Sequence, residues 1–427
     1  MTSIAKPTID PSWAKRLAQG VDGQRLWQRH AAMAQIGAIP GGGVNRQALS
    51  AEDIQARQLL LDWVVPRDYE VFVDPLANLF IRRPGADNTL APVLTGSHLD
   101  SQPLGGRFDG VYGVLAGLGV LEALDAAALT TRHPVELVVW TNEEGGRFSP
   151  GAMGSMVFTG NASWEGCLAI CDGDGVRLAD ALEQTLAATP TLARRPFNTP
   201  VASYLEAHIE QGPVLEQLGI PVGIVTGIQG ARWFTVEVTG APAHAGTAPL
   251  GQRRDALQGA VAAIAALNEL MVDPEDILRF TVGRFVVVPN APNTVAEKVT
   301  FSIDLRHPDG AVLAERGDAI AECCRRATPR CEVVVTETFR REPCGFAPPV
   351  IAAATQAAEV LAIPHHALPS GAFHDAQFMT DVCPAGMVFV PCEKGISHNP
   401  AENAKPEDLF AGAHVLAVAV AALAGVG

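Results

Sequence analysis

Six residues of this sequence have side chains suited to chemistry and lie beside apolar runs or near motifs: His98, Asp109, Glu143, Glu144, His208 and His398. His98 follows the apolar run APVLTGS, and Asp109 comes eleven residues later, just before a second apolar run. Imidazole nitrogen and carboxylate oxygen are the ligands expected for zinc, manganese or a similar divalent ion. The adjacent carboxylates of Glu143 and Glu144 would repel each other if both were buried without a cation. We therefore interpret these residues as a metal site.

Each of these residues also has a simpler interpretation when taken alone. A lone histidine is more often a core or surface residue than a ligand, and Asp109 could cap the helix that follows it. Taken together, the six residues favour the metal-site interpretation, because successive residues at a strand end point in different directions. One glutamate can then bind an ion while its neighbour faces the substrate. A shared aspartate can bridge two ions about 3.5–4 Å apart.

The elements that must position these residues alternate between strands and helices. APVLTGSH and HPVELVVWTNEE read as short buried strands, and residues 111–128 between them read as a helix. Strand, helix and strand in this order predict an α/β fold with a mostly parallel sheet. In such sheets ligands gather beyond the carboxyl ends of the strands. His98 and the two glutamates are expected at these ends.

The pattern changes after Gly223, which predicts a second domain. ARWFTVEV, LRFTVGRFVVVP and EKVTFSIDLRHP alternate like strands, with helices expected at about 253–271 and 310–328. This βαββαβ-like order is typical of a small α+β domain with helices on one sheet face. We expect residues 1–223 and 341–427 to form the catalytic domain and residues 224–340 to be inserted into it.

Composition limits the class of protein and its partners. The 427 residues are 48% hydrophobic and 18% charged, which is typical of a packed globular protein. A net charge of −15 with no basic cluster argues against nucleic acid and anionic membranes as partners. The first twenty residues lack the apolar stretch of a signal peptide. Eight scattered cysteines favour free thiols, so we expect a cytoplasmic protein.

Eight stretches of the sequence resemble the dinuclear metallohydrolases of the M20 peptidase superfamily, and more narrowly its hydantoinase/carbamoylase amidases. They cover nearly the whole chain in order and are specific together, although each one alone would be weak. The stretches are GGVNR, TGSHLDSQPLGGRFDGVYGVLAGLGVLEAL, TNEEGGRFSPGAMGSMVFTG, YLEAHIEQGPVLE, GIQGARWFTVEVTGAPAHAGTAP, DLRHPD, GAFHDAQ and GISHNPAE.

The resemblance implies two divalent ions, zinc or manganese, with cobalt or nickel also compatible. It implies that Asp109 bridges the two ions, that His98 and His208 complete one shell, and that Glu144 and His398 complete the other. Many M20 peptidases carry a carboxylate at the position of His208, so this histidine indicates the carbamoylase branch. Glu143 matches the family's general base. Asp100 would orient the His98 imidazole as a neighbouring carboxylate.

The inserted domain is expected to supply substrate contacts. Arg306 resembles the family residue that grips a substrate carboxylate, which a guanidinium does with two hydrogen bonds. Gln211, Asn290, His374 and His244 match family positions near the substrate, and His244 would stabilise the oxyanion. Inserted domains of M20 relatives pair into a homodimer, so the resemblance also implies that His244 serves the partner subunit.

The implied activity is hydrolysis of the linear C–N bond of an N-carbamoyl amino acid or a similar ureido acid, giving amino acid, ammonia and carbon dioxide. Both α- and β-ureido acids fit this prediction. Phe373 replaces the second glycine of the related motif GAGHDA and could narrow the pocket. The alternatives are an M20-type aminoacylase or dipeptidase and a catalytically dead binding protein on the same scaffold. A serine hydrolase is disfavoured because G-x-S-x-G is absent.

Overall fold

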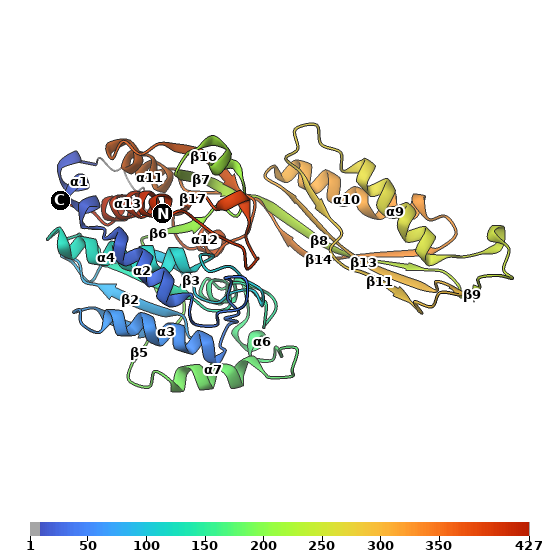
Figure 1. Ribbon diagram of the computed structural model, residues 1–427, viewed down its shortest axis with the longest axis horizontal. Helices are drawn as coiled ribbons and strands as arrows, with labels where there is room; N and C mark the ends of the chain where they lie inside the picture. The colour runs from blue at the N-terminus through green and yellow to red at the C-terminus, as the bar shows by residue number, and fades with distance from the viewer. Residues whose placement is uncertain (1–8, 427) are drawn as a thin grey trace. The chain divides into compact units, whose positions relative to one another are not determined.

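A computed structural model describes residues 9–426 of the chain. The first eight residues, part of the stretch that lacks signal-peptide character, lie outside the described residues. The chain forms two compact units (Figure 1). The larger unit contains the described residues up to Gly227 and from Gly345 onward, and the smaller unit comprises Ile228–Cys344. The smaller unit is drawn in yellow and orange.

The larger unit is built on a ten-stranded sheet with the order β15-β7-β17-β6-β3-β4-β2-β1-β5, in which β16 also pairs with β7. The four central neighbours β4, β3, β6 and β17 are parallel to one another, so their carboxyl ends meet at one edge. The strands are β1 Glu70–Val73, β2 Leu79–Arg83, β3 Val93–His98, β4 Val135–Trp140, β5 Ala193–Arg194, β6 Ser203–Ile209, β7 Val222–Ile228, β15 Cys344–Gly345, β16 His365–Ser370 and β17 Ala385–Val390.

Helices of the larger unit pack on this sheet and on one another. α4 contacts β3, β4 and β6, and α13 packs against α4 and β17. α5 contacts β4, and α12 contacts β6 and β17. The helices are α1 Pro11–Gly20, α2 Gly23–Met33, α3 Ala51–Val64, α4 Val111–Ala126, α5 Met153–Phe158, α6 Trp164–Leu168, α7 Leu178–Ala187, α8 Val214–Leu218, α11 Pro348–Val360, α12 Asp375–Met379 and α13 Pro406–Leu423.

The core of the larger unit surrounds α4 and α13, which are apolar on nearly every side. Among the described residues one helix, α13, is long and apolar enough to cross a membrane by length and composition alone. Its residues 415–421 are completely buried in the same cluster as α4 and strands β3 and β6. A helix that is hydrophobic all round and buried by protein is a core helix. The burial of α13 in the core of the larger unit therefore explains its apolar composition.

The smaller unit has an antiparallel sheet with the order β10-β13-β8-β14, in which β11 also pairs with β13. Alternate residues of β8 and β13 are buried beneath α9 and α10, as a sheet with one covered face requires. Its elements are β8 Gly230–Thr239, β9 Ala243–His244, α9 Ala256–Leu270, β10 Arg279–Thr281, β11 Phe285–Val288, β12 Thr294–Val295, β13 Lys298–His307, α10 Gly310–Ala327 and β14 Glu332–Arg341.

The predicted α/β fold with an inserted smaller α+β unit is confirmed. Strand β3, helix α4 and strand β4 form the expected parallel unit. The sequence analysis assigns no element to α1 or β6. β6 was missed because Glu206 and His208 interrupt its apolar pattern, although all seven of its residues are buried. Its alternate residues Leu205, Ala207 and Ile209 enter the apolar core.

Candidate metal centre

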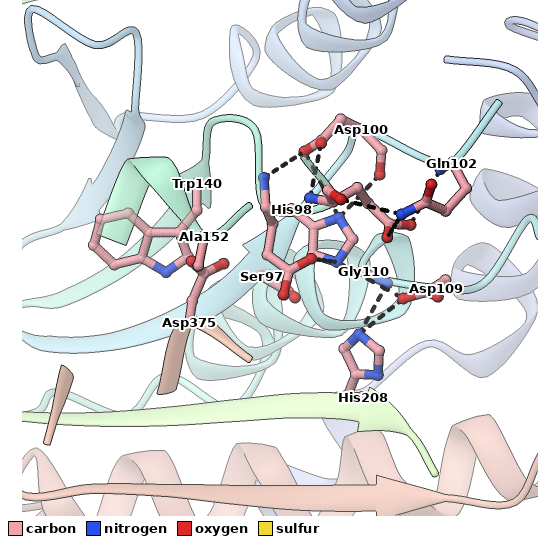
Figure 2. Close-up of polar contacts among 12 residues, drawn as sticks. Ser97, His98, Asp100, Gln102, Asp109, Gly110, Trp140, Ala152, His208 and Asp375 are labelled. Atoms are coloured by element: carbon pink, nitrogen blue, oxygen red, sulfur yellow. Dashed lines mark hydrogen bonds and ion pairs between the residues drawn. The ribbon is translucent and has the colours of Figure 1, made fainter. Parts of the chain in front are cut away.

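The candidate residues of the larger unit lie at the carboxyl edge of the four parallel strands, where Figure 2 shows His98, Asp109 and His208 close together. His98 is the last residue of β3, and His208 is the last but one of β6. Glu143 and Glu144 follow β4 by three and four residues, and His398 follows β17 by eight. This is the arrangement expected at the carboxyl ends of parallel strands, where neighbouring loops share one edge of the sheet.

His98, Asp109 and His208 form one buried donor group. The Nε2 atoms of His98 and His208 lie 3.7 Å and 3.1 Å from Oδ1 of Asp109. The Nδ1 atoms of both rings lie 2.9 Å from a main-chain carbonyl, that of Asp100 for His98 and that of Ile209 for His208. A ring whose Nδ1–H is donated to a carbonyl presents the lone pair of Nε2. In its neutral form, each of these imidazoles would therefore present Nε2 as a possible metal ligand.

Asp109, Glu144 and His398 form a second donor group on the other side of the same aspartate. Nε2 of His398 lies 3.3 Å from Oδ2 of Asp109 and 3.3 Å from Oε2 of Glu144. The two oxygens of Asp109 thus belong to different groups. This is the geometry of a carboxylate that can bridge two ions.

The separations within both groups suit a divalent ion. In a tetrahedral zinc site with ligand bonds of about 2.0–2.1 Å, neighbouring ligand atoms are about 3.4 Å apart. The Nε2–oxygen separations in the two groups lie between 3.1 Å and 3.7 Å. Two imidazoles and a carboxylate in one group, and one imidazole and two carboxylates in the other, are ligand sets for zinc or manganese.

The buried carboxylates repel one another. Burial and the neighbouring charge of Asp109 raise the pKa of Glu144 to about 8. Burial, with the charges of Asp375 and Glu144, holds the pKa of Glu143 well above its usual range. Burial alone would also raise the pKa of Asp109, but hydrogen bonds from His208 and His398 lower it well below its usual value. Bound cations would relieve this repulsion, because they favour the charged form of a nearby carboxylate.

A glycine and a turn place these side chains. Gly110, the residue directly before α4, has φ +65°, and a Cβ atom there would lie 2.3 Å from the His98 ring. Only glycine lets the backbone pass so close to this imidazole. The Asp109 side chain therefore enters the metal centre and makes no cap to α4. Asn142, also left-handed with φ +58°, turns the chain directly before Glu143.

Asp100, whose carboxylate is predicted to orient His98, contacts this imidazole and both glutamates. Its Oδ1 lies 3.8 Å from Nδ1 of His98, and its main-chain carbonyl lies 2.9 Å from the same nitrogen. The carboxylate also accepts the N–H groups of Glu143 and Glu144, each at 3.2 Å.

Glu143 lies beside the first donor group. Its Oε2 is 3.4 Å from Nε2 of His98, whereas Glu144 is directed to His398. Gln102 holds Glu144 from the opposite side, because its side-chain nitrogen donates to Oε2 of that glutamate at 2.9 Å. The two adjacent glutamates therefore face different neighbours, as their sequence spacing predicts.

Two residues missed by the sequence analysis hold the second donor group. The hydroxyl of Ser397 lies 3.0 Å from Oδ2 of Asp109 and 3.0 Å from the carboxylate of Glu402. The other oxygen of Glu402 accepts the main-chain N–H groups of Phe108 and Asp109 at 2.8 Å and 3.1 Å. Both residues lie in the motif GISHNPAE, from which only His398 is predicted as a site residue.

Gln211, predicted to contact substrate, is directed to Asp109. Its side-chain nitrogen donates to Oδ2 of Asp109 at 2.8 Å and to Ser397 at 3.1 Å. Gln211 and His398 have φ values of +56° and +52°. Left-handed backbone is costly for residues with a Cβ and is concentrated at functional sites.

His374 lies against the first donor group, and Phe373 beside it. The ring of His374 packs edge-on against that of His208, with centroids 4.5 Å apart, and its Nε2 lies 3.1 Å from the Ser370 hydroxyl. Burial and the nearby His208 hold the pKa of His374 well below its usual value. The tip of the Phe373 ring lies 3.3 Å from where a Cβ on Gly151 would stand, in the loop after Glu144.

Arg306, His244 and Asn290 belong to the smaller unit. Arg306 lies on β13, where its Nε and Nη2 donate to the carboxylate of Asp304 at 3.0 Å and 2.8 Å. His244 is exposed on β9 and pairs with Thr294 of β12. Asn290, with φ +59°, lines a depression of about 340 Å³ together with Thr294. His244 and Asn290 therefore lie at one end of this unit.

Comparison with known proteins agrees with the fold and the site. The family model of peptidase family M20/M25/M40 matches residues 94–422. The N-carbamoyl-L-amino acid amidohydrolase of Geobacillus stearothermophilus is 38% identical, over 93% of this chain and 97% of that protein. The allantoate amidohydrolase of Escherichia coli is 33% identical, over 92% of this chain and 96% of its own length.

A solved structure shows the same fold. The hydantoinase/carbamoylase family amidase of Burkholderia multivorans superposes with a TM-score of 0.87 and 43% identity, covering 95% of this chain and 98% of that one. The fold and the site thus define a hydrolase of the metal-dependent class. The chain belongs to peptidase family M20/M25/M40, as its sequence motifs predicted.

The two adjacent glutamates offer a direct test of the donor groups. Glu144→Ala should lose bound metal, because it removes one of the three donors of the group formed by Asp109, Glu144 and His398. Glu143→Gln should keep the metal content of wild type, since Glu143 lies outside both donor groups. Elemental analysis of protein loaded with zinc or manganese and then dialysed measures both. Metal loss in Glu143→Gln with full retention in Glu144→Ala would mean that the two roles are exchanged.

Proposed function

We propose that this chain hydrolyses the linear C–N bond of N-carbamoyl amino acids or closely similar ureido acids. One water and the carbamoyl compound give the amino acid and carbamate, which breaks down to ammonia and carbon dioxide. The observation that carries the proposal is the pair of donor groups sharing Asp109, with Glu143 beside them. The names of the similar amidohydrolases support the choice of substrate class.

We propose that His98, Asp109 and His208 hold one divalent ion, and that Asp109, Glu144 and His398 hold a second. Zinc or manganese fits these donors, with cobalt or nickel also compatible. Bound there, the ions would polarise the carbamoyl oxygen and stabilise the charge that develops on it. Ser397, Gln211 and Glu402 keep the shared aspartate in place through the hydrogen bonds described above.

Glu143 is the proposed general base. Burial and the neighbouring carboxylates raise the pKa of Glu143, which makes this carboxylate a stronger acceptor for a proton of the attacking water. The same carboxyl group then returns the proton to the leaving amine, as microscopic reversibility permits. The carboxylate of Asp100 accepts the main-chain N–H of Glu143. This contact keeps the base in position for both proton transfers.

The proposed carboxylate site is Arg306. Asp304 holds its guanidinium in a fixed orientation on β13, which limits the rotamer entropy lost on binding. The substrate carboxylate would bind this cation, while Asn290, His374 and Gln211 contact the remainder of the substrate. His244 is proposed to stabilise the developing oxyanion. Phe373 would limit the size of the substrate side chain near the loop after Glu144.

We further propose a homodimer that forms through the smaller unit, which would act as a lid and dimerisation domain and bring His244 to the partner subunit's site. The support is the long strand β14 at the edge of its sheet, where unpaired N–H and C=O groups invite another strand. The cytoplasm is the proposed compartment. All eight cysteines are free thiols, which fits a reducing environment.

The test of the proposed activity is product release from a substrate panel. Protein reloaded separately with zinc, manganese or cobalt should release ammonia and amino acid from N-carbamoyl-α-amino acids, N-carbamoyl-β-alanine or allantoate. N-acetyl amino acids should be poor substrates, and Glu143→Gln provides the inactive control. Faster release of amino acid from N-acetyl or dipeptide substrates would instead make the chain an aminoacylase or dipeptidase.

Arg306→Ala should raise KM strongly, because the carboxylate contact is made in both the ground state and the transition state. Part of the lost binding energy can also appear in kcat. Amidated substrates, which lack the carboxylate, should be poor for wild type and nearly indifferent to the substitution. Steady-state kinetics on matched charged and amidated substrates measures this, and equal losses on both would contradict the carboxylate assignment.

His244→Ala and Glu143→Gln proteins should each be nearly inactive alone but should complement each other when subunits exchange. In a mixed dimer one site has both an intact Glu143 and the intact histidine of the other subunit. Equal mixing makes half of the dimers mixed, so activity should recover to about a quarter of wild type. An inactive mixture with proven subunit exchange, or an active monomer, would rule out the role of His244 across subunits.

A further inference from the structure

The motif GGVNR lies outside the catalytic residues, yet it pairs with the loop that joins His98 to Asp109. Val44 and Gly105 exchange two main-chain hydrogen bonds, each 3.0 Å long. Arg46 accepts the N–H of Ser101 at 2.8 Å and donates its own N–H to the Ser101 hydroxyl at 3.0 Å. Residues 43–46 therefore form a short extended segment along the loop between two metal-centre residues.

The side chain of Arg46 lies beneath the same loop. It is 1% exposed, and its Nε donates to the carbonyl of Leu99 at 2.7 Å. Its Nη1 donates to the carbonyls of Met33 and Ile36, at 3.1 Å and 2.9 Å, at the end of α2. Burying a guanidinium is costly unless hydrogen bonds satisfy its donors. These carbonyls fix the guanidinium between α2 and the end of β3.

The Leu99 carbonyl is the point through which Arg46 can act on the metal centre. Leu99 lies between His98 and Asp100, and the Asp100 carbonyl accepts the His98 Nδ1–H. The Asp100 carboxylate accepts the N–H groups of Glu143 and Glu144. A shift of this short peptide segment would therefore move an imidazole donor and the turn that carries both glutamates.

The segment also reaches the part of the chain that carries His398. A Cβ atom on Gly43 would lie 2.4 Å from the carbonyl oxygen of Gly105 and 2.6 Å from Cα of Pro400. Gly43 is thus enclosed between the loop before Asp109 and the residue two places after His398. The absence of a side chain allows three backbone segments to meet here.

We propose that residues 43–46 brace the metal centre and that Arg46 is a positioning residue, holding the main chain that orients His98, Asp100 and the two glutamates. The brace comes from the part of the chain before residue 94, where the match to the family model begins. It touches none of the ion-binding atoms. It acts by restricting the loops that carry donors of both groups. The inference rests on the proposed metal centre but not on the proposed substrate.

The test is zinc affinity of the apo protein, measured by competition with a chromophoric chelator. Arg46→Lys keeps the charge but cannot reproduce the forked contacts. It should weaken zinc binding about 10–100-fold, the usual effect of losing a residue that orients metal ligands. The control is Arg195→Lys. Arg195 is also buried and donates to Glu136, near the amino end of β4 and away from the metal centre. This control should keep wild-type zinc affinity even where its apo form is less stable.

Ser101→Ala provides a milder variant, because it removes the contacts of the Ser101 hydroxyl with the Arg46 N–H and the Val44 carbonyl but leaves the Arg46 side chain intact. It should fold and weaken zinc binding several-fold. Wild-type zinc affinity in folded Arg46→Lys, or in Ser101→Ala where Arg46→Lys does not fold, would overturn the proposal. Equal weakening in Arg195→Lys would also overturn it, since the effect would then follow from general destabilisation. A wild-type protein that binds no zinc, manganese or cobalt would contradict the proposed metal centre instead.

Discussion

The two oxygens of Asp109 face two separate donor groups, and much of the surrounding structure keeps this one carboxylate in place. His98 and His208 approach Oδ1, while His398, Gln211 and Ser397 approach Oδ2. A buried carboxylate with so many neighbours is stable only if its charge is compensated. The acidic residues around it increase the demand for positive charge. The same concentration of negative charge destabilises the fold through repulsion and therefore favours the binding of divalent cations.

Main-chain groups orient most of the metal centre. Carbonyls hold the Nδ1 atoms of two imidazoles, and main-chain N–H groups of the Asp109 and Glu143–Glu144 turns bind the carboxylates of Glu402 and Asp100. Contacts of this kind with the backbone leave these side chains little rotamer freedom. They also connect loops from different strands, so the centre depends on the rigidity of the sheet beneath it. The apolar helices α4 and α13 supply that rigidity, because their buried faces pack tightly against β3, β6 and β17.

The proposed functions are divided between the two units. The larger unit contains both donor groups and Glu143, whereas Arg306, His244 and Asn290 belong to the smaller unit. Chemistry and recognition of the substrate carboxylate would thus come from separately folded parts.

Residue types and motifs were sufficient to determine the family and the α/β fold with its inserted unit, and they singled out Asp109 and five candidate residues that lie near it. They succeed because apolar runs mark buried strands and the residues just after them reach one sheet edge. Tertiary structure decided which atom performs each task. The Asp100 carbonyl lies closer to His98 than its carboxylate does, and Ser397, Glu402 and Arg46 act on residues from about 50 to 290 positions away in the sequence. Sequence periodicity reports which residues are buried, but such contacts depend on how loops distant in the chain pack together.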